Sequence, residues 1–275
     1  MRFPERLTAL VATLALGCFA HAASPEATRA EIATALKVRL PEVAAQDYRL
    51  GAAAIDAELR RALEENASAG AATLAAGKDL WTRKFKNGRT LSGCFPNGGR
   101  RVAAVYPQFD PRLKRVITLE MAINQCLKAH GESLYDHADP KTMGTVMAYL
   151  RSLADGQKVA VRVPPAAEER FEQGRRLYQS RLGQRNYACA SCHVQGAGKR
   201  FEEAALSPAI GQATHWPVIR KGEPVTLQER MRECLELMGA APFPAGSEEL
   251  NNLEYFLTYL SNGLPLAANA WRPER

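Results

Sequence analysis

Apolar residues recur at helical spacing in several separate stretches of the chain. Residues 24–40 have the pattern of a polar, alanine-rich helix, and Ile55, Leu59 and Leu63 form one apolar face of a helix expected over 51–67. Further helices are predicted over residues 74–84, 143–153, 168–179, 227–238 and 250–260. The pattern therefore predicts an all-α fold.

The second half of the chain repeats the first half in the order of several positions. The matched pairs are Gly77 and Gly174, Cys94 and Cys192, Leu119 and Leu227, and Cys126 and Cys234. Each half then ends in an apolar helix followed by a glycine, Gly156 or Gly263, which is typical of helix C-caps. Residues 159–167 are the predicted joint. We therefore expect two tandem small helical domains, over 24–160 with a helical extension and over 161–275.

A cofactor-attachment sequence stands in the second half. Cys189-Ala190-Ser191-Cys192-His193 reads C-x-x-C-H, in which two thiols add to the vinyl groups of one haem. The histidine that follows would ligate the iron from the proximal side. The alternative is a redox or zinc C-x-x-C with an incidental histidine. We expect one covalently bound haem c, held by Cys189 and Cys192 with His193 on the iron.

The first half lacks this attachment sequence. Leu91 stands where the first cysteine would be, and Phe95 stands where the ligating histidine would be. In a haem-bearing copy, the positions of Cys94 and Cys126 would face each other across the iron. Without haem, these thiols can approach and form a disulfide, and closing a loop of about 30 residues stabilises a fold by roughly 3–4 kcal/mol. The alternative is two separately buried thiols.

Four residues are candidates for the iron ligand opposite His193. A downstream methionine is usual in cytochromes c, so Met231 and Met238 are candidates together with His215 and Cys234. His215 lies beside tryptophan and proline, which is more typical of a packed loop residue. Cys234 matches Cys126 in the repeat, which favours a position facing the haem. The alternative is a small buried core cysteine.

A cation accompanies Cys234 on the predicted helix. Arg230 lies four residues earlier, so the two share one helix face. A fixed guanidinium favours a thiolate and offers a fork for an oxyanion. The alternative for Arg230 is a solvated surface arginine. Four basic residues elsewhere either make the haem edge positive or are ordinary surface charges. They are Lys199, Arg200, Arg220 and Lys221.

The N-terminus has the pattern of an export signal. Arg2 and Arg6 precede an apolar run over residues 7–19, and Ala20-His21-Ala22 is an A-x-A cleavage pattern. We predict that residues 1–23 are a signal peptide, with cleavage near Ala22 or Ala23, and that the mature protein is periplasmic. A lipoprotein signal at Cys18 is the alternative. No stretch is apolar enough for a membrane span.

Composition narrows the choice of partners. The 275 residues include 24% charged and 46% hydrophobic residues, as in ordinary globular proteins, and the net charge is +7. This balance favours anionic small molecules or acidic protein partners over apolar ones. Basic-aromatic motifs for nucleic acid are not found in the sequence, so nucleic-acid binding is not expected.

Taken together, the double cytochrome-like chain, the haem motif and the Arg230-x-x-x-Cys234 helix resemble the SoxA family. SoxA is the catalytic subunit of the SoxAX cytochrome of thiosulfate oxidation. Because Leu91 and Phe95 replace the first attachment site, the chain resembles the single-haem branch, in which a disulfide replaces the first haem.

The resemblance implies an enzyme, an L-cysteine S-thiosulfotransferase. Cys234 and His193 would ligate the iron, with Cys234 as the catalytic residue and often a persulfide, and Arg230 would bind thiosulfate. A small cytochrome c like SoxX would form a heterodimer with the chain and accept electrons, and a carrier like SoxYZ would supply the acceptor cysteine. The alternatives are a non-catalytic electron-transfer cytochrome with methionine ligation and a haem-based sensor.

Overall fold

Hydroxyl side chains cap the starts of four long helices, because each hydroxyl accepts a hydrogen bond from a backbone N–H that has no partner inside the helix. The capping residues are Ser24 for α1 (Pro25–Arg39), Thr118 for α5 (Leu119–Ala129), Thr226 for α8 (Leu227–Leu237) and Ser247 for α9 (Glu248–Leu260). These starts lie within two residues of the starts predicted from the sequence for α1, α8 and α9.

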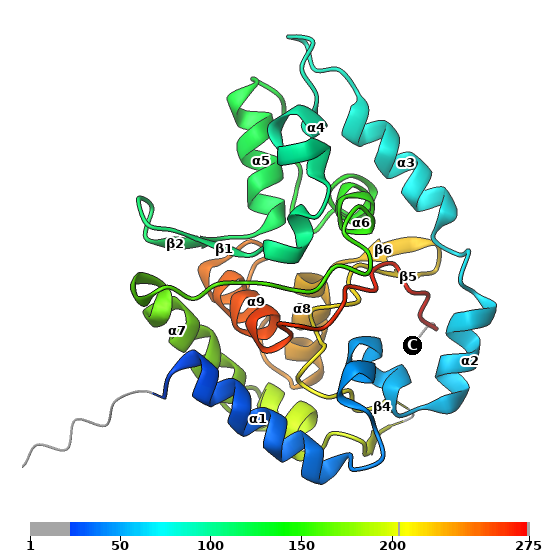
Figure 1. Cartoon of the computed structure of the whole chain (residues 1–275), viewed down its shortest axis with the longest axis vertical. Helices are drawn as coiled ribbons and strands as arrows, with labels where there is room; N and C mark the ends of the chain where they lie inside the picture. Colours follow the sequence, from blue (N-terminus) through cyan, green and yellow to red (C-terminus); the bar gives the residue numbers. More distant parts are fainter. Residues whose placement is uncertain (1–22, 203, 274–275) are drawn as a thin grey trace, which may run out of the picture.

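The computed structural model describes residues 23–202 and 204–273 and is mainly helical, which confirms the predicted fold class (Figure 1). The other helices are η1 (Ala45–Ala54), α2 (Ala57–Glu65), α3 (Ala71–Thr82), α4 (Leu91–Cys94), η2 (Pro96–Gly99), η3 (Val102–Val105), η4 (Pro140–Gly144), α6 (Thr145–Ser152), η5 (Pro165–Ala167), α7 (Glu168–Gln179) and η6 (Ser191–Gln195). The predicted signal peptide lies outside the described residues, apart from Ala23. Among the described residues, no helix has both the length and the apolar character needed to cross a membrane.

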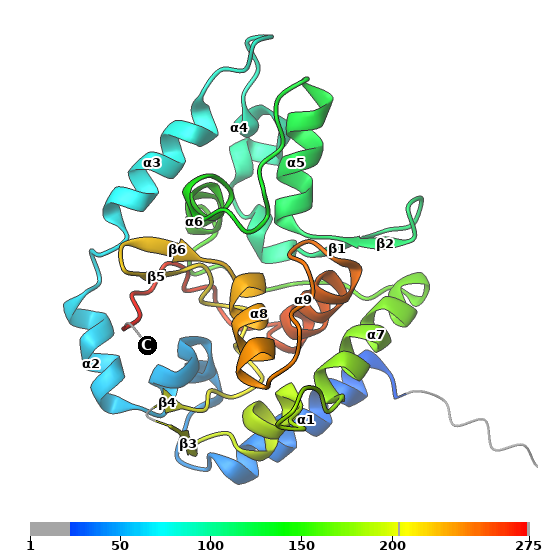
Figure 2. The same ribbon diagram turned by 180° about the vertical axis from the view of Figure 1, so that it is seen from behind.

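Each half contains the same kind of crossing between two helices. Helix α3 packs on α6 in the first half, and α7 packs on α9 in the second (Figures 1 and 2). Both crossings occur at a matched glycine. A methyl group on Gly77 would lie 2.5 Å from the Thr145 carbonyl oxygen, and one on Gly174 would lie 2.1 Å from the Asn252 carbonyl oxygen. The sequence repeat is therefore also a repeat in packing.

A short antiparallel hairpin precedes the cysteine-bearing helix in each half. Strands β1 (Gln108–Asp110) and β2 (Arg115–Ile117) lead into α5, and β5 (Val218–Arg220) and β6 (Glu223–Val225) lead into α8. A third hairpin pairs β3 (Arg200–Phe201) with β4 (Ala204–Ala205). The sequence analysis missed all three, because strands of two or three residues are too short to show a clear alternation of apolar and polar positions.

The predicted joint is held against the rest of the fold. Val159 and Val161 are buried. The N–H of Val159 donates to the Leu264 carbonyl at 3.0 Å, and the N–H of Gly263 donates back to Val159 at 2.9 Å. The segment between the two halves therefore lies along the C-terminal end of the chain.

The continuous helix predicted over residues 51–67 is wrong. Gly51 has φ +62, which ends any regular helix at that point, and η1 finishes at Ala54. A new helix, α2, then starts after Asp56, whose carboxylate accepts a hydrogen bond from the Leu59 N–H at 3.0 Å. The apolar spacing continues across the break at Asp56, but the helical conformation of the backbone does not.

Candidate haem and anion site

The C-x-x-C-H sequence lies in a tight turn after α7. The Ser191 N–H donates to the Ala188 carbonyl at 2.9 Å, and the Ser191 hydroxyl accepts from the Ala188 N–H at 3.1 Å. The turn continues into η6 with Cys189 and Cys192 as free, partly buried thiols. Serine in the middle of the motif thus closes the turn that brings the two thiols to one side.

The ring of His193 is held through its Nδ1 atom. This nitrogen lies 2.8 Å from the Ser207 carbonyl oxygen and 3.1 Å from the Ser207 hydroxyl. A carbonyl accepts only from a protonated nitrogen, so the bond assigns the proton to Nδ1 and leaves Nε2 as the nitrogen of the pair suited to ligate a metal. Metal-ligating histidines are commonly oriented by such a bond. Ser207, for which the sequence contains no motif, supplies this bond.

Cys234 lies near both attachment thiols. Burial, and after it the neighbouring Cys234 sulfur, raise the pKa of Cys189 to about 12. Burial and Cys234 also raise the pKa of Cys192. Burial raises the pKa of Tyr178, on α7, well above its usual value, and all three sulfurs add to that effect. The structure therefore brings Cys189, Cys192 and Cys234 together beside Tyr178.

The other three candidates for the iron ligand are all buried. Met231 and Met238 are both buried in the hydrophobic core. His215 is also buried, and burial followed by the charge of Arg272 lowers its pKa to about 3, so its ring is neutral at physiological pH. A methyl group on Gly51 would lie 2.6 Å from His215 Cε1, which shows how closely the ring is packed.

Arg230 belongs to a charged network on α8. Its Nη1 donates to Glu233 Oε2 at 3.0 Å. Arg220, on β5, also binds Glu233 through both terminal nitrogens, with Nη1 3.2 Å from Oε2 and Nη2 on Oε1. Burial raises the pKa of Glu233, but the bonds from Arg220 and Arg230 outweigh burial and lower it overall. Glu233 is therefore an ionised bridge between two guanidinium groups.

A cavity of 320 Å³ adjoins this network. It lies between residues 137–140 of the first half and the β5–β6 hairpin of the second. Arg220 and Glu233 are among the described residues that line it. Solvent therefore reaches the Arg220–Glu233 pair from the seam between the two halves.

Two of the other basic residues considered from the sequence, Arg200 and Arg220, form ion pairs. Arg200 forms an ion pair with Asp56 across a distance of 3.2 Å. Arg220 is the one that the structure connects to Arg230. This connection could not be predicted from local sequence spacing, because Arg220 and Glu233 are 13 positions apart and lie on different elements.

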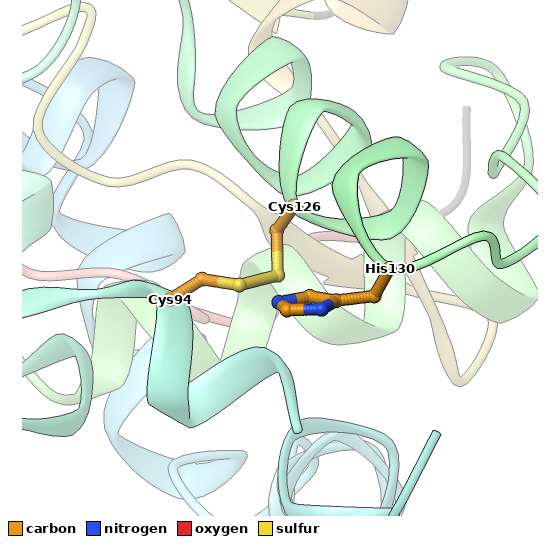
Figure 3. A group of neighbouring side chains, drawn as sticks. All are labelled: Cys94, Cys126 and His130. Atoms are coloured by element: carbon orange, nitrogen blue, oxygen red, sulfur yellow. A yellow bond between two sulfur atoms is a disulfide. The ribbon is translucent and has the colours of Figure 1, made fainter. Parts of the chain in front are cut away.

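In the first half, Cys94 and Cys126 are joined by a disulfide (Figure 3). His130 lies beside it, and its ring nitrogen and the two sulfurs are all within 4.8 Å of one another. The sulfurs are bonded to each other, so this trio does not offer thiolate ligands to a metal. His130 Nδ1 accepts a hydrogen bond from the Asn87 side-chain amide nitrogen at 3.0 Å, a partner that sequence reasoning did not find.

Core side chains occupy the other positions of the lost attachment sequence. Leu91 is fully buried, and Phe95 is buried with its ring centroid 5.1 Å from that of Trp81. Trp81 is the match of Tyr178 in the repeat. The first half is thus packed with apolar side chains where the second half has thiols and a histidine.

The residues of the second half fit a c-type haem. Two unbonded thiols lie on one turn, the histidine next to them is oriented by a carbonyl, and a third sulfur lies close to both thiols. A redox C-x-x-C needs neither the oriented histidine nor the third sulfur. A Cys3His zinc site would use the same donors, but the histidine directly after the second cysteine is the order of a c-type haem attachment sequence, which favours haem.

Comparison with known proteins gives the same picture. The family described as SoxA/TsdA, cytochrome c domain, matches the chain twice, over residues 76–159 and 173–266, which confirms the prediction of two cytochrome c-like parts. The L-cysteine S-thiosulfotransferase subunit SoxA of Chlorobaculum tepidum is 41% identical over 82% of this chain and 79% of its own length. That of Allochromatium vinosum is 38% identical over 93% and 92%. A crystal structure of SoxXA from P. pantotrophus has a TM-score of 0.72 at 25% identity, and covers 79% of this chain and 84% of that chain.

Proposed function

This chain belongs to the SoxA family, and from that premise we propose that it is the SoxA subunit of an L-cysteine S-thiosulfotransferase. It couples thiosulfate oxidatively to a cysteine of a carrier protein. The observation that carries the proposal is the position of Cys234. Its sulfur is close enough to both attachment thiols to raise their pKa, and it lies one helical turn after Arg230 on α8.

The second half would hold one haem c. Cys189 and Cys192 would be its attachment thiols, and His193 and Cys234 would be the ligands of its iron. The Ser207 carbonyl keeps the His193 ring in the orientation for ligation, since it accepts from Nδ1. The corresponding domains are residues 24–160, without haem, and 161–275, with it.

The chain's own residues prepare the sulfur chemistry. Arg230 binds the thiosulfate dianion through charge-assisted hydrogen bonds and lowers the cost of bringing it near the electron-rich Cys234 sulfur. A sulfur–sulfur bond forms between thiosulfate and the carrier thiol. The thiol loses its proton, and two electrons are released for each bond made. When bound, haem supplies one-electron exchange, by which these electrons leave the site.

Partners follow from the same assignment. A SoxX-like small cytochrome c forms a heterodimer with the chain and receives the electrons, in keeping with the SoxXA complex that the fold matches. A SoxYZ-like carrier presents the cysteine. The proposed location is the periplasm, reached after cleavage of the signal peptide near Ala22 or Ala23.

Replacement of Cys234 tests the proposal. We expect C234S and C234M to lower thiosulfate-dependent turnover by on the order of 10³-fold or more, because each removes the reacting thiol. Turnover is measured with purified haem-loaded protein, the carrier and an electron acceptor, and the absorption spectrum checks that haem is still attached.

A C234M variant with unchanged turnover would contradict the proposal. The chain would then be an electron-transfer cytochrome with methionine ligation. Intact-protein mass spectrometry of the wild type provides a second check, since it counts one haem, one disulfide and any additional sulfur on Cys234.

A further inference from the structure

The network around Arg230 suggests how its guanidinium group is aimed. We propose that Glu233 and Arg220 are positioning residues that hold Arg230 in place for the thiosulfate anion. Glu233 fixes Arg230, and Arg220 fixes Glu233. The inference rests on the proposed function, because it assumes that Arg230 is the residue that binds the substrate.

Helix geometry places the three α8 residues of the site together. Arg230, Glu233 and Cys234 stand at positions i, i+3 and i+4, which share one helix face. The Arg230 side chain is only 17% exposed, so it has limited freedom, and its bond to Glu233 is 3.0 Å long. A long flexible side chain is thereby tied to the same face as the reactive sulfur.

The two arginines are bound unequally. Arg220 donates hydrogen bonds to both carboxylate oxygens of Glu233, whereas Arg230 donates to one oxygen through Nη1. A guanidinium has five N–H donors, so this bond leaves the larger part of the Arg230 fork for a ligand. Arg220 thus has the geometry of an anchor, and Arg230 has that of a binding group.

The anchor itself stands on a rigid support. Arg220 follows Ile219, which is fully buried on β5. The Ile219 N–H donates to the Ala270 carbonyl at 3.1 Å, and the Ile219 carbonyl accepts from the Arg272 N–H at 2.8 Å. The C-terminal segment therefore holds the strand from which Arg220 extends.

The charges also favour an anion. Two guanidinium groups and one carboxylate leave one net positive charge on the network. The carboxylate offsets the repulsion between the two cations, so they can stay close together without a bound ligand. Binding then requires little rearrangement, which lowers its entropic cost.

A double-mutant cycle tests the proposal. We expect R220A to raise the KM for thiosulfate about tenfold, the scale of a weakened charge-assisted hydrogen bond, with kcat within about twofold of the wild type. The KM of R220K, which keeps the charge but not the forked guanidinium, should lie between the KM of the wild type and that of R220A. In an R230A background, adding R220A should change KM by less than about twofold, because Arg220 acts only through Arg230.

Binding of sulfate, a dianion that does not react, gives a readout besides activity. Calorimetry should show the same tenfold loss of affinity in R220A. R232A is the matched control, since Arg232 forms a similar ion pair on the same helix with Glu229 at 3.0 Å but is not bonded to Glu233 in the described structure. Its KM and sulfate affinity should equal those of the wild type.

Two results would overturn the proposal. The first is R220A with wild-type KM and sulfate affinity, in a protein whose melting temperature and haem spectrum are unchanged. The second is a full R220A effect that persists in the R230A background, which would mean that Arg220 contacts the anion itself. Failure of the proposed function gives a different result, because wild-type protein would then show no thiosulfate turnover at all.

Discussion

At the scale of single residues, one of the two matched cysteines is in a disulfide and the other is a free thiol. Cys126 is bonded to Cys94, whereas its match Cys234 is a free thiol next to Cys189 and Cys192. The half that lacks the attachment sequence gains a covalent cross-link, and the half that has it keeps three thiols. The same position therefore carries a cross-link in one half and, in the proposed function, the reacting sulfur in the other.

Removal of the disulfide should cost stability without altering the haem half. For C94S/C126S we expect a loss of roughly 4 kcal/mol in the free energy of unfolding, from the chain entropy of a loop closed across 32 positions. Urea denaturation of the haem-loaded protein measures the loss. Wild-type stability in the double variant would show that the cross-link is dispensable, and the haem absorption spectrum serves as the control.

At the scale of elements, close helix contact depends on two glycines. Gly77 lets α3 approach α6, and Gly174 lets α7 approach α9. An added methyl group would meet backbone carbonyl oxygens, which cannot rotate away as a flexible side chain would. Alanine has a better helix propensity than glycine by about 1 kcal/mol, but the clash is the larger effect.

Alanine at either crossing should therefore destabilise the protein. We expect G77A and G174A each to lower the melting temperature, with a net loss of about 1–3 kcal/mol in the free energy of unfolding. G93A is the control, because its methyl group would have only the Thr90 hydroxyl nearby, at 3.6 Å. Equal melting temperatures for G174A and G93A would contradict the packing argument.

Sequence reasoning succeeded where one local signal sufficed. Helix α7 occupies residues 168–179, as predicted, and α8 ends one residue short of the predicted 227–238. It failed where the signal was weak or distant. The break at Asp56 interrupts an apolar spacing that remains helical in the sequence. The bond from Arg220 to Glu233 joins charged residues that each resemble surface charge in the sequence.

At the scale of the whole molecule, charged groups are buried where the halves meet. Glu254 on α9 accepts from Gln228 on α8 at 2.9 Å, and Arg151 of the first half lies in the same electrostatic environment as Glu254 and Glu120. Burial, and after it the Glu120 carboxylate, raise the pKa of Glu254 to about 8. The folded protein therefore holds a proton at this seam that the unfolded chain releases near pH 4.5.

This difference makes stability depend on pH. A carboxyl group whose pKa is raised by folding stabilises the fold below its unfolded pKa, and the contribution is lost as pH rises toward 8. We expect the free energy of unfolding to fall between pH 5 and 8 by roughly 2–4 kcal/mol more in the wild type than in E254Q, whose amide does not ionise. Urea denaturation at several pH values measures this, and parallel curves for the two proteins would refute it.

Helix α1, near the start of the described chain, docks on the end of α9 in the second half. Arg29 of α1 donates to the carbonyls of Leu260, at 3.2 Å, and Asn262, at 2.7 Å, where α9 ends (Figure 1). Synthesis proceeds from the N-terminus, so α1 is complete more than 200 residues before the segment that it binds. The first helix to be made must therefore wait for the last, and a chain that stops short of α9 leaves α1 without its docking site however well the intervening half has folded.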